Sequence, residues 1–222
     1  LDAFGSVSTA VVGPANKWDK FYYDIYSENS DGYFSVMLQG LNKNTKSWDT
    51  LATNVDSEYD LSDLDDSMYQ YLKSDISVVD SSYGLSSVIK IKSIGITYSP
   101  PAEIMIYNKS ISFQPDTILQ GLNTILKTRI SNIGYSDAKN IKLDYFISDN
   151  EIQSDTTLFV NIGDINKYSE IEFIDTINTT PYLFENTLKI QANFQDFEFF
   201  PFNNFASNFV YVARDSINPL FN

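Results

Sequence analysis

The stretch IKLDYFIS, residues 141–148, decides the fold class of this chain. Apolar side chains occupy every second position, and they are Ile141, Leu143, Tyr145 and Ile147. Such alternation with a period of two is typical of a β-strand that buries one face and exposes the other. Residues 33–40 and 187–195 repeat the pattern. The sequence therefore predicts a protein built from half-buried strands.

Further strands are predicted along the whole chain, with turn residues between most of them. They lie near residues 19–26, 68–79, 87–98, 124–131, 157–162, 168–175 and 205–213. No helix of ten residues or more is predicted, although residues 60–66 are expected to form one helical turn with Leu61 and Leu64 facing inward. Many short strands at regular spacing favour an all-β fold of two consecutive antiparallel β-sandwich domains.

Two consecutive prolines, Pro100 and Pro101, mark the predicted domain boundary. Proline cannot pair within a central strand, and a proline pair stiffens a linker. We therefore expect one sandwich over residues 1–100 and a second over 101–214. Residues 215–222 are expected to begin a linker to a further domain, so the chain is interpreted as a fragment of a longer protein.

The chain contains neither histidine nor cysteine, and it carries a net charge of −14. The commonest general base, the commonest metal ligand and the thiolate nucleophile are therefore all missing, so we expect no enzyme activity from this chain. A strongly negative chain repels phosphate backbones, which argues against nucleic-acid binding. No apolar run is long enough for a transmembrane segment.

The densest group of charges is a set of acidic residues between two predicted strands. They are Asp56, Glu58, Asp60, Asp63, Asp65 and Asp66. Several carboxylate oxygens are the ligands that calcium prefers, so these residues are the weak candidates for a calcium site. An EF-hand is excluded, because Leu61 and Ser67 occupy positions that require Gly and Glu. The other interpretation is a solvated acidic turn, and no other cofactor is predicted.

A second group of residues with functional potential is aromatic. Phe197, Phe199, Phe200, Phe202 and Phe205 lie in or beside a predicted connection between two strands. A single hairpin loop cannot turn all of these rings inward, so some are expected to form an interface with another domain or protein. Trp18 and Trp48 are expected to be core or inter-sheet residues.

Four segments, taken in order, resemble one family of bacterial proteins. They are VVGPANKWDKFYYDI (11–25), DLSDLDDSMYQYLKSDISVVDSS (60–82), LKTRISNIGYSDAKNIKLDYFIS (126–148) and NNFASNFVYVARDSINPLFN (203–222). Together they are similar to the region downstream of the catalytic domain in gingipain-type cysteine peptidase family proteins, including PorU-like sortases of Bacteroidetes type IX secretion. The turn at residues 132–134, the pair Asn203-Asn204 and the linker Arg214-Asp215 match this family. Gln70 departs from it, because the family usually has proline there.

The resemblance implies a first sandwich of jelly-roll or galactose-binding-like type. It implies a second sandwich similar to the CARDB immunoglobulin-like domain. No catalytic residue is carried over, because the chemistry of that family depends on Cys and His. The implied location is extracellular, at the cell surface or in the periplasm of a bacterial envelope. The implied partners are neighbouring domains of the same protein or secretion-system subunits.

The leading hypothesis is therefore a noncatalytic structural or interaction fragment of a large bacterial surface protein. The alternative is a carbohydrate-binding module in the first sandwich, stabilised by calcium, with Trp or Tyr on a concave face near the acidic residues. A third hypothesis is hydrolysis by carboxylates alone. That reaction requires two close carboxyl groups in a cleft, one with a raised pKa, and no pair is singled out by the sequence.

Overall fold

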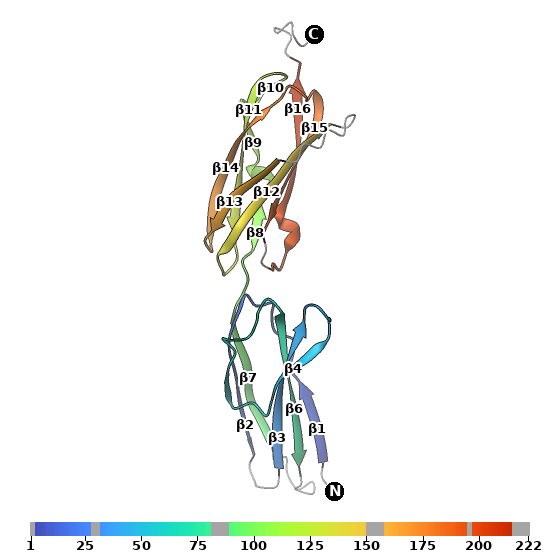
Figure 1. The fold of residues 1–222 in the computed structure, drawn as a ribbon, viewed down its shortest axis with the longest axis vertical. Helices are drawn as coiled ribbons and strands as arrows, with labels where there is room; N and C mark the ends of the chain where they lie inside the picture. The colour runs from blue at the N-terminus through green and yellow to red at the C-terminus, as the bar shows by residue number, and fades with distance from the viewer. Residues whose placement is uncertain (1–2, 28–31, 81–88, 150–157, 195–196, 215–222) are drawn as a thin grey trace. The chain divides into compact units, whose positions relative to one another are not determined.

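The computed structural model describes residues 3–27, 32–80, 89–149, 158–194 and 197–214. The chain divides into two compact units, residues 1–100 and 101–222. Strands make up nearly all of the regular structure (Figure 1). The predicted all-β class is confirmed, and each unit is a β-sandwich. The predicted linker at residues 215–222 lies outside the described residues.

Within its described residues, the first unit has seven strands in two antiparallel sheets. One sheet has the order β1-β6-β3-β4 and the other has the order β5-β2-β7. The strands are β1 (Ala3–Ser8), β2 (Lys17–Ser27), β3 (Gly32–Asn42), β4 (Trp48–Thr53), β5 (Glu58–Asp60), β6 (Tyr69–Asp80) and β7 (Ile89–Ser99). β1 and β7 are therefore edge strands of different sheets, and each leaves one side of its backbone without a ladder.

The core of the first unit lies between its two sheets. β2 contributes Trp18 and Phe21, and the other sheet contributes Leu38 and Leu72, all of them buried. The indole nitrogen of Trp18 donates a hydrogen bond to the Tyr69 carbonyl oxygen at 2.6 Å, which satisfies its one polar atom in the core. Trp18 is thus the core residue that the sequence predicted.

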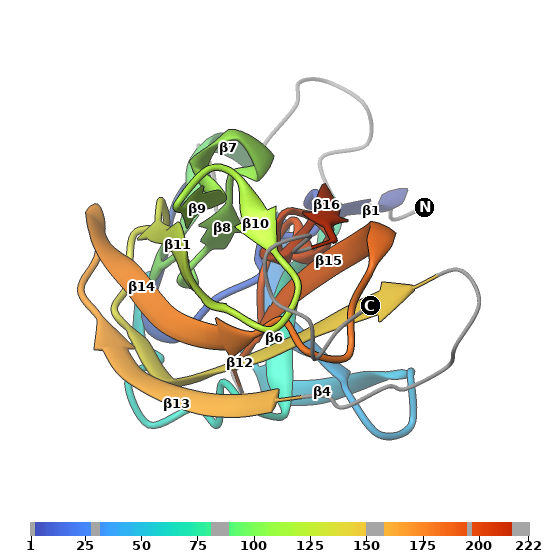
Figure 2. The ribbon, with the colours of Figure 1, turned by 90° about the horizontal axis from the view of Figure 1, so that it is seen from above.

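The described part of the second unit has nine strands and two 3₁₀ turns. The elements are β8 (Ile104–Ile106), η1 (Asn108–Ser110), β9 (Ser112–Gln114), β10 (Ile118–Leu119), β11 (Asn123–Asn132), β12 (Ala138–Asp149), β13 (Leu158–Ile165), β14 (Ser169–Asn178), β15 (Phe184–Asn193), η2 (Pro201–Asn204) and β16 (Phe205–Ala213). One sheet runs β10-β16-β15-β12-β13, and the other runs β14-β11-β8 with β9 also paired to β11. Figure 2 shows β14 and β11 on one side of this unit and β15 and β16 on the other. The ladders are antiparallel except for the two-residue pairing of β10 with β16.

The stretch at residues 141–148 lies in β12 at the centre of this second core. Its alternating side chains are buried as predicted, and they face Leu126 and Ile130 of the opposite sheet. The hydroxyl of Tyr145 donates to the carboxylate of Asp175 on β14, so the one polar group in this row is satisfied. Burial, followed by this hydrogen bond, raises the pKa of Tyr145.

The predicted strands are present, but the helical turn predicted over residues 60–66 is wrong. Residues 60–66 form hydrogen-bonded turns and no helix, because the Asp60 and Asp65 carboxylates accept hydrogen bonds from the backbone amides of Ser62 and Met68. β15 ends at Asn193, and Phe194 directly after it is partly buried against the core of the second unit. Leu61 is buried as predicted, and Leu64 is half-buried.

Candidate functional site

The connection between β15 and β16 inverts the usual distribution of polar and apolar side chains. Over residues 197–205, which we call the aromatic loop, Phe200 and Phe202 are 64% and 89% exposed. Phe197, Phe199 and Phe205 are also exposed, whereas Glu198 and Asn204 are buried. An ordinary loop of this composition buries its rings and exposes its carboxylate. The five phenylalanines singled out by the sequence therefore all present ring surface to solvent.

The exposed aromatic surface continues from the loop along β16. Alternate residues of this strand face outward, so Phe205 is followed on the same face by Phe209 and Tyr211. Phe184 of β15 lies beside Tyr211, with the ring centroids 6.4 Å apart. The outer face of this sheet thus extends the aromatic loop with further exposed rings.

Glu103, just before β8, fixes the backbone of the loop. Its carboxylate accepts hydrogen bonds from the amides of Phe199 and Phe200 at 2.9 and 3.2 Å, and from the side-chain amide of Asn203 at 2.9 Å. The carboxylate is buried in the process. Charge-assisted hydrogen bonds to a buried carboxylate are stronger than those between neutral groups, so they hold the loop in one conformation.

Glu198 makes the reciprocal connection from the loop back to β8. One of its oxygens accepts a hydrogen bond from the Ile104 amide at 2.7 Å, and the other accepts from the side-chain amide of Asn204. Burial, reinforced by the neighbouring charge of Glu103, raises the pKa of Glu198 to about 7. Two carboxyl groups that lie far apart in the sequence therefore tie the loop to β8 from both sides.

The turn at residues 132–134 contacts the backbone of Glu103 and so helps to position this pair of carboxylates. The side-chain oxygen of Asn132 accepts from the amides of Glu103 and Gly134, and its nitrogen donates to the carbonyl oxygens of Ser136 and Ile165. A β-carbon on Gly134 would lie only 2.4 Å from the Glu103 nitrogen. Glycine is therefore required here, because the backbone before β8 passes directly over the turn.

The two carboxylates resemble an acid–base pair, but their surroundings favour a structural role. Each oxygen of Glu103 and Glu198 already accepts at least one hydrogen bond from the protein. Both side chains are buried, and neither lines the cavity of the first unit or the hollows of the second that are described below. A general acid must reach its substrate, so the pair does not meet the geometric requirement for carboxylate-only hydrolysis.

The acidic residues proposed for calcium are not gathered into a site. Glu58 pairs with Lys20 at 2.9 Å, while the Asp60 and Asp65 carboxylates accept hydrogen bonds within their own turns. Asp56, Asp63 and Asp66 complete the predicted set. Throughout the part of the chain that the structure describes, no three acidic side chains lie close enough together to hold a metal ion.

The tryptophans predicted for the carbohydrate alternative do not form a platform in the first unit. Trp18 is buried, and one face of the half-buried Trp48 is covered by the Lys73 ammonium group, 4.8 Å from the ring centroid. The second unit instead has two adjoining hollows of about 440 and 420 Å3 that share Tyr107 and Glu170. Exposed Tyr168 lines one hollow, and Lys109 lines the other.

Sequence reasoning found the rings of this site but missed the carboxylates that position them. Glu103 precedes the short strand β8, which carries no clear alternation, and Glu198 stands among phenylalanines as an apparently solvated charge. The one available signal was a lone acidic residue inside an aromatic run. That signal does not identify Glu103 as its neighbour, because 94 residues separate the Ile104 amide from Glu198.

Comparisons with known proteins find likeness only among solved structures, because no protein-family model and no curated protein matches the sequence. The CARDB domain of a Pyrococcus furiosus protein, in a crystal structure with di-metal ions, is 14% identical with a TM-score of 0.39; the match covers 50% of this chain and 88% of that one. A solution structure of that domain is 15% identical with a TM-score of 0.40, covering 53% and 98%. A Bacteroides uniformis β-glucuronidase is 11% identical with a TM-score of 0.36, covering 86% and 26%. Likeness at these levels adds nothing to the functional argument.

Over its described residues, the structure contains no helix with the length and hydropathy of a membrane span. The location of the protein stays a prediction from the sequence.

Proposed function

We propose that this chain is a noncatalytic interaction module that binds a protein partner through its aromatic loop. The partner would be a neighbouring domain of the same polypeptide or a subunit of a secretion system. The parent would be a bacterial surface protein related to the type IX secretion sortase family. The family resemblance of the segments around residues 132–134 and 203–204 supports this assignment.

The observation that carries the proposal is the buried carboxylate pair beneath exposed phenylalanines. Burying Glu103 and Glu198 costs free energy, and their hydrogen bonds are directed at the backbone and amide groups of the loop. A loop without a binding role gains stability from the opposite arrangement. The loop therefore holds its rings outward in one defined conformation, which lowers the entropic cost of binding a partner.

The area of the aromatic surface is in the range expected for an interface. Five phenylalanines of the loop expose between 36% and 89% of their surface, which is roughly 500 Å2 of aromatic area. Monomeric proteins rarely expose larger apolar patches unless these have a function. A standard interface buries about 800 Å2 on each partner, so the loop together with the outer face of β16 is large enough.

The test is a triple substitution of exposed rings, Phe199→Ser, Phe200→Ser and Phe202→Ser, with Phe159→Ser as the matched control. Phe159 is 73% exposed on β13, so its substitution removes an exposed phenylalanine from the same unit outside the loop. Binding is measured as retention of the purified chain by detergent-solubilised envelope proteins from a bacterium with type IX secretion. We expect at least about a hundredfold loss for the triple variant, because central aromatic residues dominate interface energies.

Three outcomes are informative. Loss of retention in the triple variant with a native circular dichroism spectrum supports the proposal, provided that the Phe159 control binds normally. Retention that equals that of the unsubstituted chain overturns it. A triple variant that does not fold shows that the rings are core residues, and the interface is then rejected.

One observation favours carbohydrate binding as a second candidate, located in the second unit. The hollows that share Tyr107 and Glu170 combine exposed tyrosine faces with Lys127, Arg129 and Glu172, which supply both stacking surfaces and hydrogen-bonding groups. Glycan-array binding that disappears with Tyr107→Ala would support this candidate. An array without signal above background would exclude it.

A further inference from the structure

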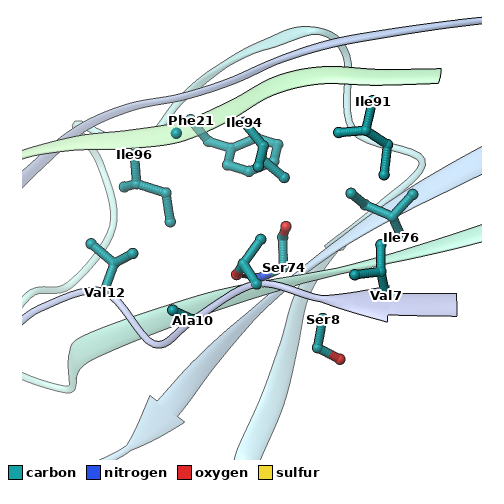
Figure 3. Close-up of a pocket in the computed structure, with 12 residues that line it drawn as sticks. Val7, Ser8, Ala10, Val12, Phe21, Ser74, Ile76, Ile91, Ile94 and Ile96 are labelled. Atoms are coloured by element: carbon teal, nitrogen blue, oxygen red, sulfur yellow. Dashed lines mark hydrogen bonds between the residues drawn. The ribbon is translucent and has the colours of Figure 1, made fainter.

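A cavity of about 350 Å3 opens between the two sheets of the first unit. It lies between the edge strands β1 and β7, and the inner face of β6 forms its floor (Figure 3). Small-molecule sites in proteins have volumes from about 300 Å3 upward and mostly apolar walls. This cavity meets both criteria, and it belongs to a different unit from the aromatic loop.

A β-bulge gives the cavity its apolar wall. Ile91 pairs with Ile25 and Ser93 pairs with Asp24, so Lys92 is the additional residue on β7. In a regular strand, Ile91 would face the opposite side from Ile94 and Ile96, because side chains alternate. The additional residue restores the alignment, and all three isoleucines line the cavity, as Figure 3 shows.

The opposite wall carries a polar group without a partner. Ser74 stands on β6 between the inward-facing Leu72 and Ile76, is fully buried, and lines the cavity. Its backbone is satisfied, because its amide donates to the Thr9 hydroxyl at 3.0 Å and its carbonyl oxygen accepts from the Thr9 amide at 2.9 Å. Among the residues that the structure describes, none is a hydrogen-bond partner of its own hydroxyl oxygen. A buried hydroxyl without a partner is destabilising, so its presence in an apolar row calls for an explanation.

We propose that this cavity binds a neutral aliphatic molecule whose hydroxyl or carbonyl group is hydrogen-bonded by Ser74. The isoleucines of β7 would cover the aliphatic chain, and the hydroxyl groups of Ser74 and Thr9 would face its polar end. A cavity of 150 Å3 holds benzene, so about 350 Å3 accommodates roughly ten to fourteen non-hydrogen atoms.

The charges around the cavity favour a neutral ligand. No basic side chain is among the lining residues. The hydroxyl of Ser8, which is a lining residue, is already used, because it donates to the Asp75 carboxylate at 2.5 Å. A fatty acid would therefore find no cation among the lining residues, whereas an alcohol would find the hydroxyl of Ser74.

The experiment is a titration of the full chain with 1-hexanol and 1-octanol, observed through the isoleucine methyl resonances. The methyl groups of Ile76, Ile91, Ile94 and Ile96 are expected to shift. Those of Ile141 in the core of the second unit are expected to stay unchanged. Each buried methylene strengthens binding about fourfold, so octanol should bind about fifteen times more tightly than hexanol.

Substitutions at Ser74 separate the polar and apolar contributions. Ser74→Ala should weaken octanol binding about fivefold while preserving the ratio between octanol and hexanol. Ser77→Ala is the matched control, because Ser77 is exposed on the same strand and does not line the cavity. Ser74→Leu should fill the cavity, abolish binding and raise the melting temperature, since it replaces an unpaired hydroxyl by apolar contacts.

Several results would overturn the proposal. They are the absence of isoleucine shifts, equal shifts in the two units, and octanol binding that is unchanged by Ser74→Ala. If Ser74→Leu does not fold, the titration of the unsubstituted chain and the alanine variant still decide the matter. If the cavity instead serves to receive a strand from another protein, the alcohols will not shift the isoleucine methyl resonances, and the small-molecule site is rejected.

Discussion

Replacing Glu198 with glutamine is expected to abolish a pH dependence in the stability of the second unit. Burial raises the pKa of Glu198 to about 7, compared with 4.5 for an ordinary glutamate. Between these two values the folded state binds more protons than the unfolded state. The contribution of Glu198 is therefore fully present below pH 4.5, and it is lost as the pH rises to about 7.

The size of the effect follows from the same two pKa values. Their difference corresponds to about 3 kcal/mol between the protonated and ionised forms. Solvent near the exposed loop screens part of this, so we expect a loss of about 1–2 kcal/mol between pH 4.5 and 7. This corresponds to about a 5- to 30-fold change in the equilibrium between the folded form of this region and the form that is opened locally.

The glutamine variant imitates the protonated carboxyl group. Its side-chain oxygen can accept the hydrogen bond from the Ile104 amide, and its nitrogen can donate to Asn204 if that amide turns over. In the turned amide, the Asn204 oxygen accepts this hydrogen bond in place of the one that the Asn204 nitrogen donates to Glu198, so the pairing between the two side chains is kept. The variant should therefore match the original chain at pH 4.5 and exceed it in stability at pH 8. Glu185→Gln, at an exposed position on β15, is the matched control.

Hydrogen exchange at the amides of Ile104, Phe199 and Phe200 is the appropriate assay, because these groups donate to the two carboxylates. Protection factors of the original chain and of both variants are compared at each pH, which removes the intrinsic pH dependence of exchange. Protection in the original chain should fall 5- to 30-fold from pH 4.5 to 7. If protection stays constant, or if the glutamine variant shows the same fall, the reasoning about Glu198 is wrong.

Three further predictions concern the same unit and the acidic turn. Glu103→Ala removes the acceptor of three hydrogen bonds, so the free energy of unfolding of the second unit should fall by about 2–4 kcal/mol. The measurement is tyrosine circular dichroism in urea. Tryptophan fluorescence reports only residues 1–100, so an unchanged fluorescence transition is the internal control. Gly134→Ala should lower the free energy of unfolding by about 2–3 kcal/mol, because the added β-carbon overlaps the backbone. Gly163→Ala should lower it by only about 1–2 kcal/mol, because no described atom lies within 4 Å of its added β-carbon. Equal losses would contradict the close approach at Gly134. Millimolar calcium should leave the melting temperature unchanged, and a rise reversed by a chelator would restore the calcium hypothesis.

Much of the fold was accessible from local pattern alone. The alternation in residues 141–148 predicted both a strand and its buried face, and Pro100-Pro101 marks the division between the two compact units. Short strands such as β5, β8 and β10 were not predicted. A segment of two or three residues becomes a strand only because a partner strand lies beside it, and its own sequence carries no period.

The candidate site was likewise predictable from the sequence only in part. The crowding of phenylalanines over residues 197–205 is enough to predict exposed rings, since a single loop cannot bury them all. The role of Glu103 and Glu198 is decided by topology, which brings the segment before β8 against a loop nearly a hundred residues later. The unpaired hydroxyl of Ser74 is likewise invisible in an alternating strand, where serine fits either face. Sequence periodicity reports which face of a strand is buried, whereas the partner of a buried polar atom depends on contacts that only the folded chain creates.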